Sequence, residues 1–242
     1  MPTLIPPDAM LSDVHPANEP QSEPAFDALA RLSALALSAS AHQPPAAQAQ
    51  AQRDLQTLEQ ALQESERRGQ RLQTLALSDA LTGLSNRVHF ERALTAELGH
   101  AMRMDHPFTL LLLDLDGFKA INDGFGHAAG DEVLREVSQR ITQQMRLGDV
   151  LARLGGDEFG IVMRDGSDDA AKALARRIVK AVSQPITLGS GDEVGVGVSI
   201  GLAAYANHIT SVRTLMGHAD QALYQAKKQN ERRWKMFVGM RA

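Results

Sequence analysis

Residues 153–160 read Arg-Leu-Gly-Gly-Asp-Glu-Phe-Gly, and an apolar run that starts at Phe108 ends in Asp114-Leu115-Asp116. Each acidic cluster stands at the edge of a predicted strand. A glycine pair has no Cβ atoms, so its backbone amides can approach a phosphate closely, and the carboxylates beside it can bind a divalent cation. The two stretches together predict a divalent-metal nucleotidyl-transfer site on a strand and a neighbouring hairpin.

Outward from this pair, helical and strand-like patterns alternate around one hairpin. The patterns predict helices over 86–103, 130–145, 168–183 and 212–228, and strands over 108–115, 150–154, 159–164, 194–204 and 234–237. That order favours a mixed α/β (α+β) fold, with a central, mostly antiparallel sheet flanked by helices.

Composition limits the classes of function. The 242 residues suffice for one well-packed domain with an appendage, and residues 51–242 carry 24 acidic and 24 basic side chains, so no nucleic-acid polymer is expected as a partner. The chain has no cysteine, which excludes disulfides and thiol catalysis. Because the start lacks a signal-peptide pattern and the stretch 25–41 is too short and too charged to span a bilayer, we expect a cytoplasmic protein without a membrane span.

The N-terminal part differs from the rest. Eight of the ten prolines precede residue 46, which predicts a disordered or weakly helical segment over 1–50. Over 51–77, the residues at alternating spacings of three and four predict a coiled-coil helical linker; they are Leu55, Leu58, Leu62, Ser65, Gly69, Leu72 and Ala76. A solvated single helix is the alternative. The catalytic domain is then expected over 78–242.

Several ordered motifs extend the pattern: Asp-Ala-Leu-Thr-Gly-Leu-Ser-Asn-Arg at 79–87, Asp-Leu-Asp-Gly-Phe-Lys-Ala-Ile-Asn-Asp at 114–123, His-Ala-Ala-Gly-Asp at 127–131, Val-Ser-Ile-Gly at 198–201 and Ala-Asp-Gln-Ala-Leu-Tyr-Gln-Ala-Lys at 219–227. With residues 155–159, they resemble the GGDEF-domain diguanylate cyclase family over about residues 78–238. The resemblance implies a fold similar to the palm of nucleotide polymerases and to class III nucleotide cyclases. It also implies synthesis of the bacterial second messenger cyclic di-GMP from two GTP molecules.

Phosphodiester synthesis from a nucleoside triphosphate requires charge neutralisation and an activated 3'-hydroxyl, which two divalent cations supply. Asp114 and Asp157 are the predicted metal ligands. The resemblance adds the carbonyl of Leu115, and Glu158 as a second-metal ligand or proton acceptor, with two Mg²⁺ per site and Mn²⁺ as an alternative. Lys119 is expected near the phosphates. Asp116 is expected to point away from Asp114, with a helix-capping role and a catalytic role both open.

Guanine presents N–H donors at N1 and N2 and an acceptor at O6, which an amide and a carboxylate can match. Asn122 and Asp131 stand at the base-reading positions of the family, and His127 is expected close by. Gly155, Gly156 and Lys227 are expected to contact the triphosphate. Where the family usually has a further arginine this chain has Glu231, so either Arg232 or Arg233 substitutes or triphosphate binding is weaker, and Arg232 is the assigned residue.

The sequence Arg-Leu-Gly-Asp over 146–149 stands at the family's spacing for a product-inhibitory site. Arg176 or Arg177 is expected to add a contact from a neighbouring helix, and Arg177 is the assigned residue. Because one site holds one GTP and the product needs two, the reaction requires a homodimer. A receptor that binds cyclic di-GMP without turnover, and a scaffold that acts through its N-terminal helices, are the alternatives.

Overall fold

The computed structural model describes residues 45–104, 106–164, 166–228 and 233–237. The chain divides into two compact units between Gln70 and Arg71. Helix α2 (Pro45–Leu77) takes in the predicted linker and begins before it. The predicted N-terminal segment up to residue 44 lies outside the described residues. Among the described helices, none is both long and apolar enough to cross a bilayer.

The second unit is built on a five-stranded sheet with the order β2-β3-β1-β6-β7. Its strands are β1 (Phe108–Asp116), β2 (Val150–Gly155), β3 (Glu158–Arg164), β6 (Gly197–Ala204) and β7 (Trp234–Met236). Every neighbouring pair is antiparallel except β6 and β7, which are parallel. The predicted mostly antiparallel sheet is therefore confirmed, with the apolar run of β1 at its centre.

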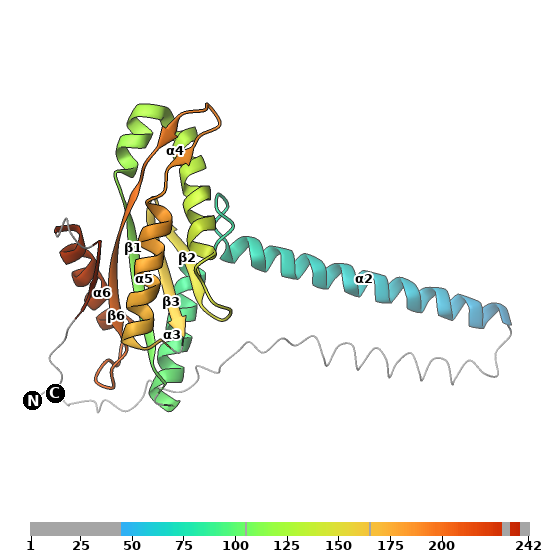
Figure 1. The fold of residues 1–242 in the computed structure, drawn as a ribbon. Coiled ribbons are helices and arrows are strands. Elements are labelled where there is room, and N and C mark those ends of the chain that lie inside the picture. The colour runs from blue at the N-terminus through green and yellow to red at the C-terminus, as the bar shows by residue number, and fades with distance from the viewer. Residues whose placement is uncertain (1–44, 105, 165, 229–232, 238–242) are drawn as a thin grey trace, which may run out of the picture. The chain divides into compact units, whose positions relative to one another are not determined.

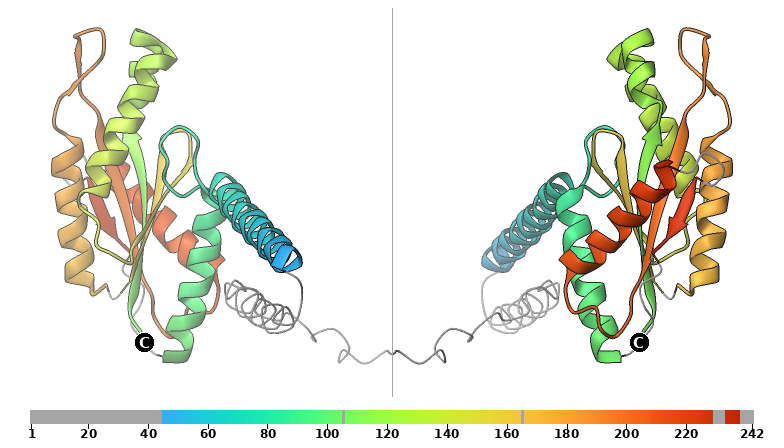
Figure 2. Two further views of the ribbon diagram at one scale, coloured as in Figure 1. Left: turned by 90° about the vertical axis from the view of Figure 1, so that its right-hand side faces the viewer. Right: turned by 90° about the vertical axis from the view of Figure 1, so that its left-hand side faces the viewer.

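Helices cover both faces of this sheet, as Figures 1 and 2 show. Helices α4 (Phe118–Thr142) and α5 (Asp168–Val182) pack on the face that carries Leu111, Leu113 and Leu115. Helices α3 (Arg87–Met104) and α6 (Val212–Lys228) pack on the opposite face, against Leu110 and Leu112. The alternation of β1 side chains between two cores is the strand period of two, and it decides which face the acids at its end share.

Two elements differ from the sequence expectation. Helix α4 begins at Phe118 and not at Gly130, and Gly126 interrupts it with a φ of 83°. The nearby glycines lower the helix propensity of this first part. Burial of Phe118 and Ile121 stabilises it instead. The predicted strand over 194–204 is split, because Glu193–Val194 (β5) pairs with Ile186–Thr187 (β4) in a separate small hairpin.

Candidate active site

The two acidic clusters meet at one end of the sheet. The antiparallel register of β1 and β3 sets Asp114 opposite Glu158, and the backbone N–H of Leu115 donates to the carbonyl of Asp157 at 3.2 Å. The turn between β2 and β3 contains Gly155 at φ 147° and Gly156 at φ 53°, values that side chains with a Cβ rarely adopt. The glycine pair thus allows the tight turn that brings Asp157 and Glu158 to the end of β1.

Asp114 is a half-buried carboxylate in contact with the ammonium group of Lys227. Its Oδ2 lies 2.8 Å from Lys227 Nζ at the end of α6, and its side chain is 18% exposed. Burial raises the pKa of Asp114, and the charges of Asp157 and Asp116 add to the rise, while Lys227 opposes it. Three carboxylates therefore act on one another at this end of the sheet, which is the electrostatic condition for a cation site.

The donor chemistry fits magnesium, although the acids do not form a closed cage. Among the described residues, no group of three or more Asp, Glu, His or Cys side chains is arranged to hold a metal ion. Mg²⁺ binds proteins through one or two carboxylates and otherwise keeps water and phosphate oxygens. Asp114 and Asp157 offer two such carboxylates, and Leu115, which follows Asp114 in β1, adds a backbone carbonyl as a candidate third oxygen donor.

Asp116 lies on the same face of β1 as Asp114, so the expectation that it points away is wrong. Residues two apart in a strand project to one face. Asp116 accepts hydrogen bonds from Ser199 Oγ at 2.9 and 3.1 Å, and its Oδ2 lies 2.6 Å from Arg233 Nη1. It does not cap α4 either, because Gly117 is the N-cap residue and no side chain caps this end. Exposed Lys119 stands in the first turn of that helix.

The predicted base-reading residues lie on α4, on the two sides of the interruption at Gly126. Asn122 is half-buried and crosses over Gly130 so closely that a Cβ at residue 130 would overlap Asn122 Oδ1. Half-buried Asp131 directly follows Gly130, and exposed His127 directly follows the interruption at Gly126. The kink therefore brings the Asn122 amide against Gly130, the residue before Asp131, whereas an uninterrupted helix would set residues 122 and 131 on opposite faces.

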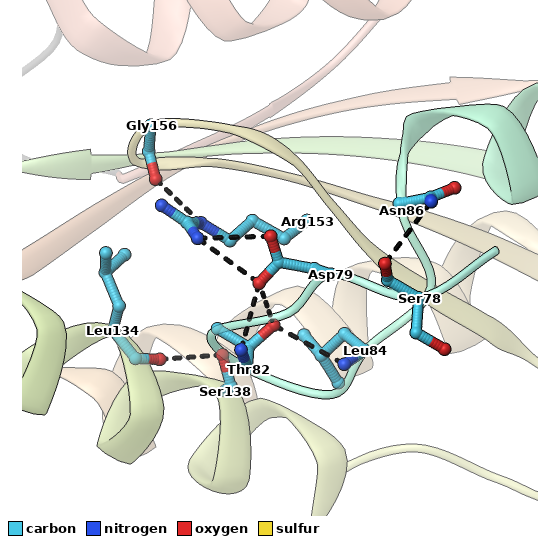
Figure 3. Close-up of polar contacts among 9 residues, drawn as sticks. All are labelled: Ser78, Asp79, Thr82, Leu84, Asn86, Leu134, Ser138, Arg153 and Gly156. Atoms are coloured by element: carbon cyan, nitrogen blue, oxygen red, sulfur yellow. Dashed lines mark hydrogen bonds and ion pairs between the residues drawn. The ribbon is translucent and has the colours of Figure 1, made fainter. Parts of the chain in front are cut away.

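An ion pair frames the glycine turn from outside (Figure 3). Arg153 Nε donates to the carbonyl of Gly156 at 2.9 Å, and its Nη1 lies 3.2 Å from both oxygens of Asp79. Burial raises the pKa of Asp79, but hydrogen bonds from Thr82 and Arg153 outweigh it and hold that pKa below its usual value. The sequence motif over 79–87 thus supplies the counter-charge that fixes the arginine on the turn.

A second arginine reaches the same hairpin from the start of α3. Arg87 Nε donates to the carbonyl of Leu154 at 3.0 Å, and Arg87 Nη2 lies 3.5 Å from Glu158 Oε2. The preceding residue, Asn86, donates to the carbonyls of Ala76 and Ser78 at 2.8 and 3.3 Å. The sequence pattern assigns Arg87 no role of its own, because only the fold sets this residue against Glu158.

A cavity of about 200 Å³ adjoins Glu158 on the face covered by α3 and α6. Its lining is mixed, with apolar side chains and three charged ones; it comprises Arg87, Leu112, Leu113, Leu154, Glu158, Phe159, Met216, Asp220 and Leu223. Burial raises the pKa of Asp220. The cavity therefore continues the acidic site between the two helices.

The predicted product-inhibitory residues lie away from this end of the sheet. The Asp149 side chain is 3% exposed and accepts hydrogen bonds from the backbone N–H groups of Arg146 and Arg164, at 3.4 and 3.1 Å. Arg146 is exposed and donates to the carbonyl of Arg164 at 3.2 Å, and exposed Arg177 donates to the carbonyl of Gln144 at 3.1 Å. Asp149 thus also holds the loop before β2 in place.

The fold therefore gathers most predicted site residues into two neighbourhoods. The acidic end of the sheet holds Asp114, Leu115, Asp157, Glu158, Gly155, Gly156 and Lys227, and α4 carries Lys119, Asn122, His127 and Asp131. Arg232 and Glu231 lie outside the described residues. Arg233, the other candidate for the substituted arginine, contacts Asp116.

Comparison with protein families places these residues in a known domain. The family model described as diguanylate cyclase, GGDEF domain, matches residues 76–233. The bifunctional diguanylate cyclase/cyclic di-GMP phosphodiesterase MucR of Pseudomonas aeruginosa is 42% identical over 163 residues, which are 67% of this chain and 24% of MucR. Diguanylate cyclase TpbB of Pseudomonas aeruginosa is 41% identical over 152 residues, 62% of this chain and 35% of TpbB. The chain thus spans about a quarter of the length of MucR and about a third of the length of TpbB.

Solved structures agree with the fold. The GGDEF domain of TpbB from Pseudomonas aeruginosa superposes with a TM-score of 0.62 at 38% identity, over 66% of this chain and 94% of that one. The coiled coil and GGDEF domain of DgcB from Caulobacter crescentus, in complex with c-di-GMP, gives a TM-score of 0.71 at 26% identity, over 78% of this chain and 98% of that one.

Proposed function

Because this chain belongs to the GGDEF family of diguanylate cyclase domains, we propose that it condenses two GTP molecules into cyclic di-GMP and two pyrophosphates. One observation carries the proposal: Asp114 stands opposite Glu158 in the β-register, with the Asp157 carbonyl bonded to Leu115 N–H. A strand-end acid and an acidic glycine turn thus form one site. GTP as substrate makes the cytoplasm the expected compartment.

Asp114, Asp157 and the carbonyl of Leu115 would hold Mg²⁺, with Glu158 as ligand of a second ion or as acceptor of the 3'-hydroxyl proton. Bound Mg²⁺ or Mn²⁺ would neutralise the triphosphate and lower the pKa of the attacking hydroxyl. Arg87 is set to orient Glu158, and Arg153 to hold the turn at the Gly156 carbonyl. The uncapped first turn of α4 offers backbone N–H groups to phosphate oxygens, and Lys119 adds charge there.

Guanine would be read by Asn122 and Asp131. A carboxylate accepts hydrogen bonds from the N1 and N2 donors of guanine, whereas adenine would set its N1 acceptor against the carboxylate. The proximity of Asn122 to Gly130, the neighbour of Asp131, supports a shared role. His127 would contact the nucleotide from the same helix, and Gly155 and Gly156 would let the turn approach the triphosphate.

Two such domains must face each other, because each would bring one GTP and its 3'-hydroxyl must reach the other's α-phosphorus. We expect a homodimer through α2, whose Leu58 is 58% exposed in the described helix. Linking the domains raises their effective concentration. The domain organisation that follows is an N-terminal segment over 1–50, a coiled-coil linker over 51–77 and the cyclase domain over 78–242.

Product would bind at Arg146, Asp149 and Arg177 and limit the reaction. Exposed guanidinium groups can grip the phosphate and the Hoogsteen edge of guanine. Arg146 and Arg177 are exposed on neighbouring elements, which supports this role.

The test is incubation of the purified chain with GTP and Mg²⁺, followed by chromatography of the products, with Asp157→Asn as the matched control. Cyclic di-GMP from the wild type and none from the variant supports the proposal. Tight binding of cyclic di-GMP without turnover would instead make the chain a receptor, and neither binding nor turnover would leave only a scaffold role.

A further inference from the structure

Both carboxylates at the end of β1 are already neutralised by cations from the C-terminal part of the chain. Lys227 Nζ lies 2.8 Å from Asp114 Oδ2, and Arg233 Nη1 lies 2.6 Å from Asp116 Oδ2. Gly197 on β6 leaves the room for this arginine, since a Cβ there would lie 3.0 Å from Arg233 Nη1. Two ion pairs therefore stand side by side on one face of the strand.

An ammonium group at 2.8 Å competes with a divalent cation for the same carboxylate. The two positive charges repel, and Mg²⁺ needs oxygen ligands at about 2.1 Å in a regular octahedron. The phosphates of a nucleoside triphosphate would remove this competition, because they attract both the metal and the two basic side chains.

We propose that Lys227 and Arg233 are internal counter-ions of Asp114 and Asp116, and that metal and triphosphate bind cooperatively by drawing both cations from carboxylate to phosphate. Arg233 then performs the role of the arginine that Glu231 replaces in the sequence. The inference rests on the proposed function in taking Asp114 as a metal ligand and a triphosphate as the substrate. It predicts that a site with several acids binds metal less tightly until the nucleotide arrives.

The discriminating measurement is a titration with Mn²⁺ in the absence of nucleotide. Electron paramagnetic resonance measures the concentration of the free ion and so reports how much Mn²⁺ is bound. Lys227→Met is compared with Lys228→Met, which removes an equal charge from an exposed lysine that lies over Tyr224. We expect Lys227→Met to bind Mn²⁺ about two- to fivefold more tightly than wild type, the range that loss of a partly exposed ion pair corresponds to. Lys228→Met should match the wild type.

Equal or weaker Mn²⁺ binding by Lys227→Met than by Lys228→Met would overturn the proposal. Adding Asp114→Asn to Lys227→Met should remove the gain in Mn²⁺ affinity. If the gain persisted, its origin would not be Asp114, and the proposal would be overturned as well. These titrations need no turnover, so they stand apart from the success or failure of the cyclase assay.

The exchange is tested with a nonhydrolysable GTP analogue. In the wild type the analogue should strengthen Mn²⁺ binding more than it does in Lys227→Met, and equal strengthening would contradict the exchange. Arg233→Met should weaken binding of the analogue several-fold while Arg232→Met does not. The reverse pattern would assign the triphosphate contact to Arg232 and refute the role of Arg233.

Discussion

Gly130→Ala should separate guanine recognition from folding. Gly130 lies in the helical part of α4, and a Cβ there would overlap Asn122 Oδ1 and lie 3.0 Å from Asn122 Cγ and 3.2 Å from Phe118 Cζ. The nearest obstacle is the far end of a flexible side chain. We therefore expect Asn122 to rotate away, which removes its amide from the guanine edge while the helix persists.

The magnitudes can be worked from these contacts. Loss of one amide and its hydrogen bonds to a base costs about 1–2 kcal/mol, or about 5- to 30-fold in Kd for GTP. Alanine gains up to about 1 kcal/mol over glycine inside a helix. Pressure on the Phe118 ring costs about 1–2 kcal/mol, the lower part of the range for overpacking, because the added Cβ would still lie 3.2 Å from Phe118 Cζ. The free energy of unfolding should thus change by no more than about 1 kcal/mol.

The assay is calorimetric titration with a nonhydrolysable GTP analogue, with urea unfolding in parallel. Gly124→Ala is the matched control, because it lies on the same helix and nothing stands within 4 Å of its added Cβ. Asn122→Ala and the double variant complete a mutant cycle. Since both single changes remove the same contact, their effects should not add.

Unchanged affinity in Gly130→Ala, at unchanged stability, would refute the reasoning. Full additivity in the cycle would do so too, because the loss would then come from something other than Asn122.

The remaining predictions concern the frame of the turn and the loop before β2. Asp79→Asn should lower the free energy of unfolding by about 1–3 kcal/mol at neutral pH, because Arg153 loses its charged partner. The pKa of Asp79 is held below its usual value, so this stabilisation is present above the ordinary aspartate value of about 3.9 and is lost as the pH falls through the lowered one. Urea unfolding across this range should show the gap to wild type closing, and a constant gap would contradict the ion pair. Arg146→Ala should relieve inhibition by added cyclic di-GMP with little change in melting temperature, whereas Asp149→Ala should also destabilise, because two backbone N–H groups lose their acceptor; equal stability of the two variants would contradict this.

The sheet was predictable because its strands are read locally. The apolar run before Asp114 and the turn at Gly155-Gly156 each carry their own signal, and the turn joins β2 and β3 in a hairpin. The pairing of β1 with β3 joins segments far apart in the chain, so only the fold shows its register. The first part of α4 was not predictable, because Gly124 and Gly126 lower its helix propensity and burial of Phe118 stabilises it instead. Tertiary packing outweighed the local preference.

The candidate site divides in the same way. The types of residue it needs are readable as motifs, since metal and guanine chemistry demand particular donors. The contacts of Lys227 with Asp114, Arg233 with Asp116 and Arg87 with Glu158 join residues far apart in the chain, so no local pattern reports them. The face of Asp116 was predictable from strand periodicity alone.

The most direct test of the account is the product balance of the purified chain with GTP and Mg²⁺. Cyclic di-GMP and pyrophosphate are quantified together over time, beside Asp157→Asn. The account predicts one cyclic di-GMP for every two pyrophosphates, with neither formed by the variant. Absence of cyclic di-GMP from the wild type, or an equal amount from the variant, would contradict the assignment of this site as a diguanylate cyclase.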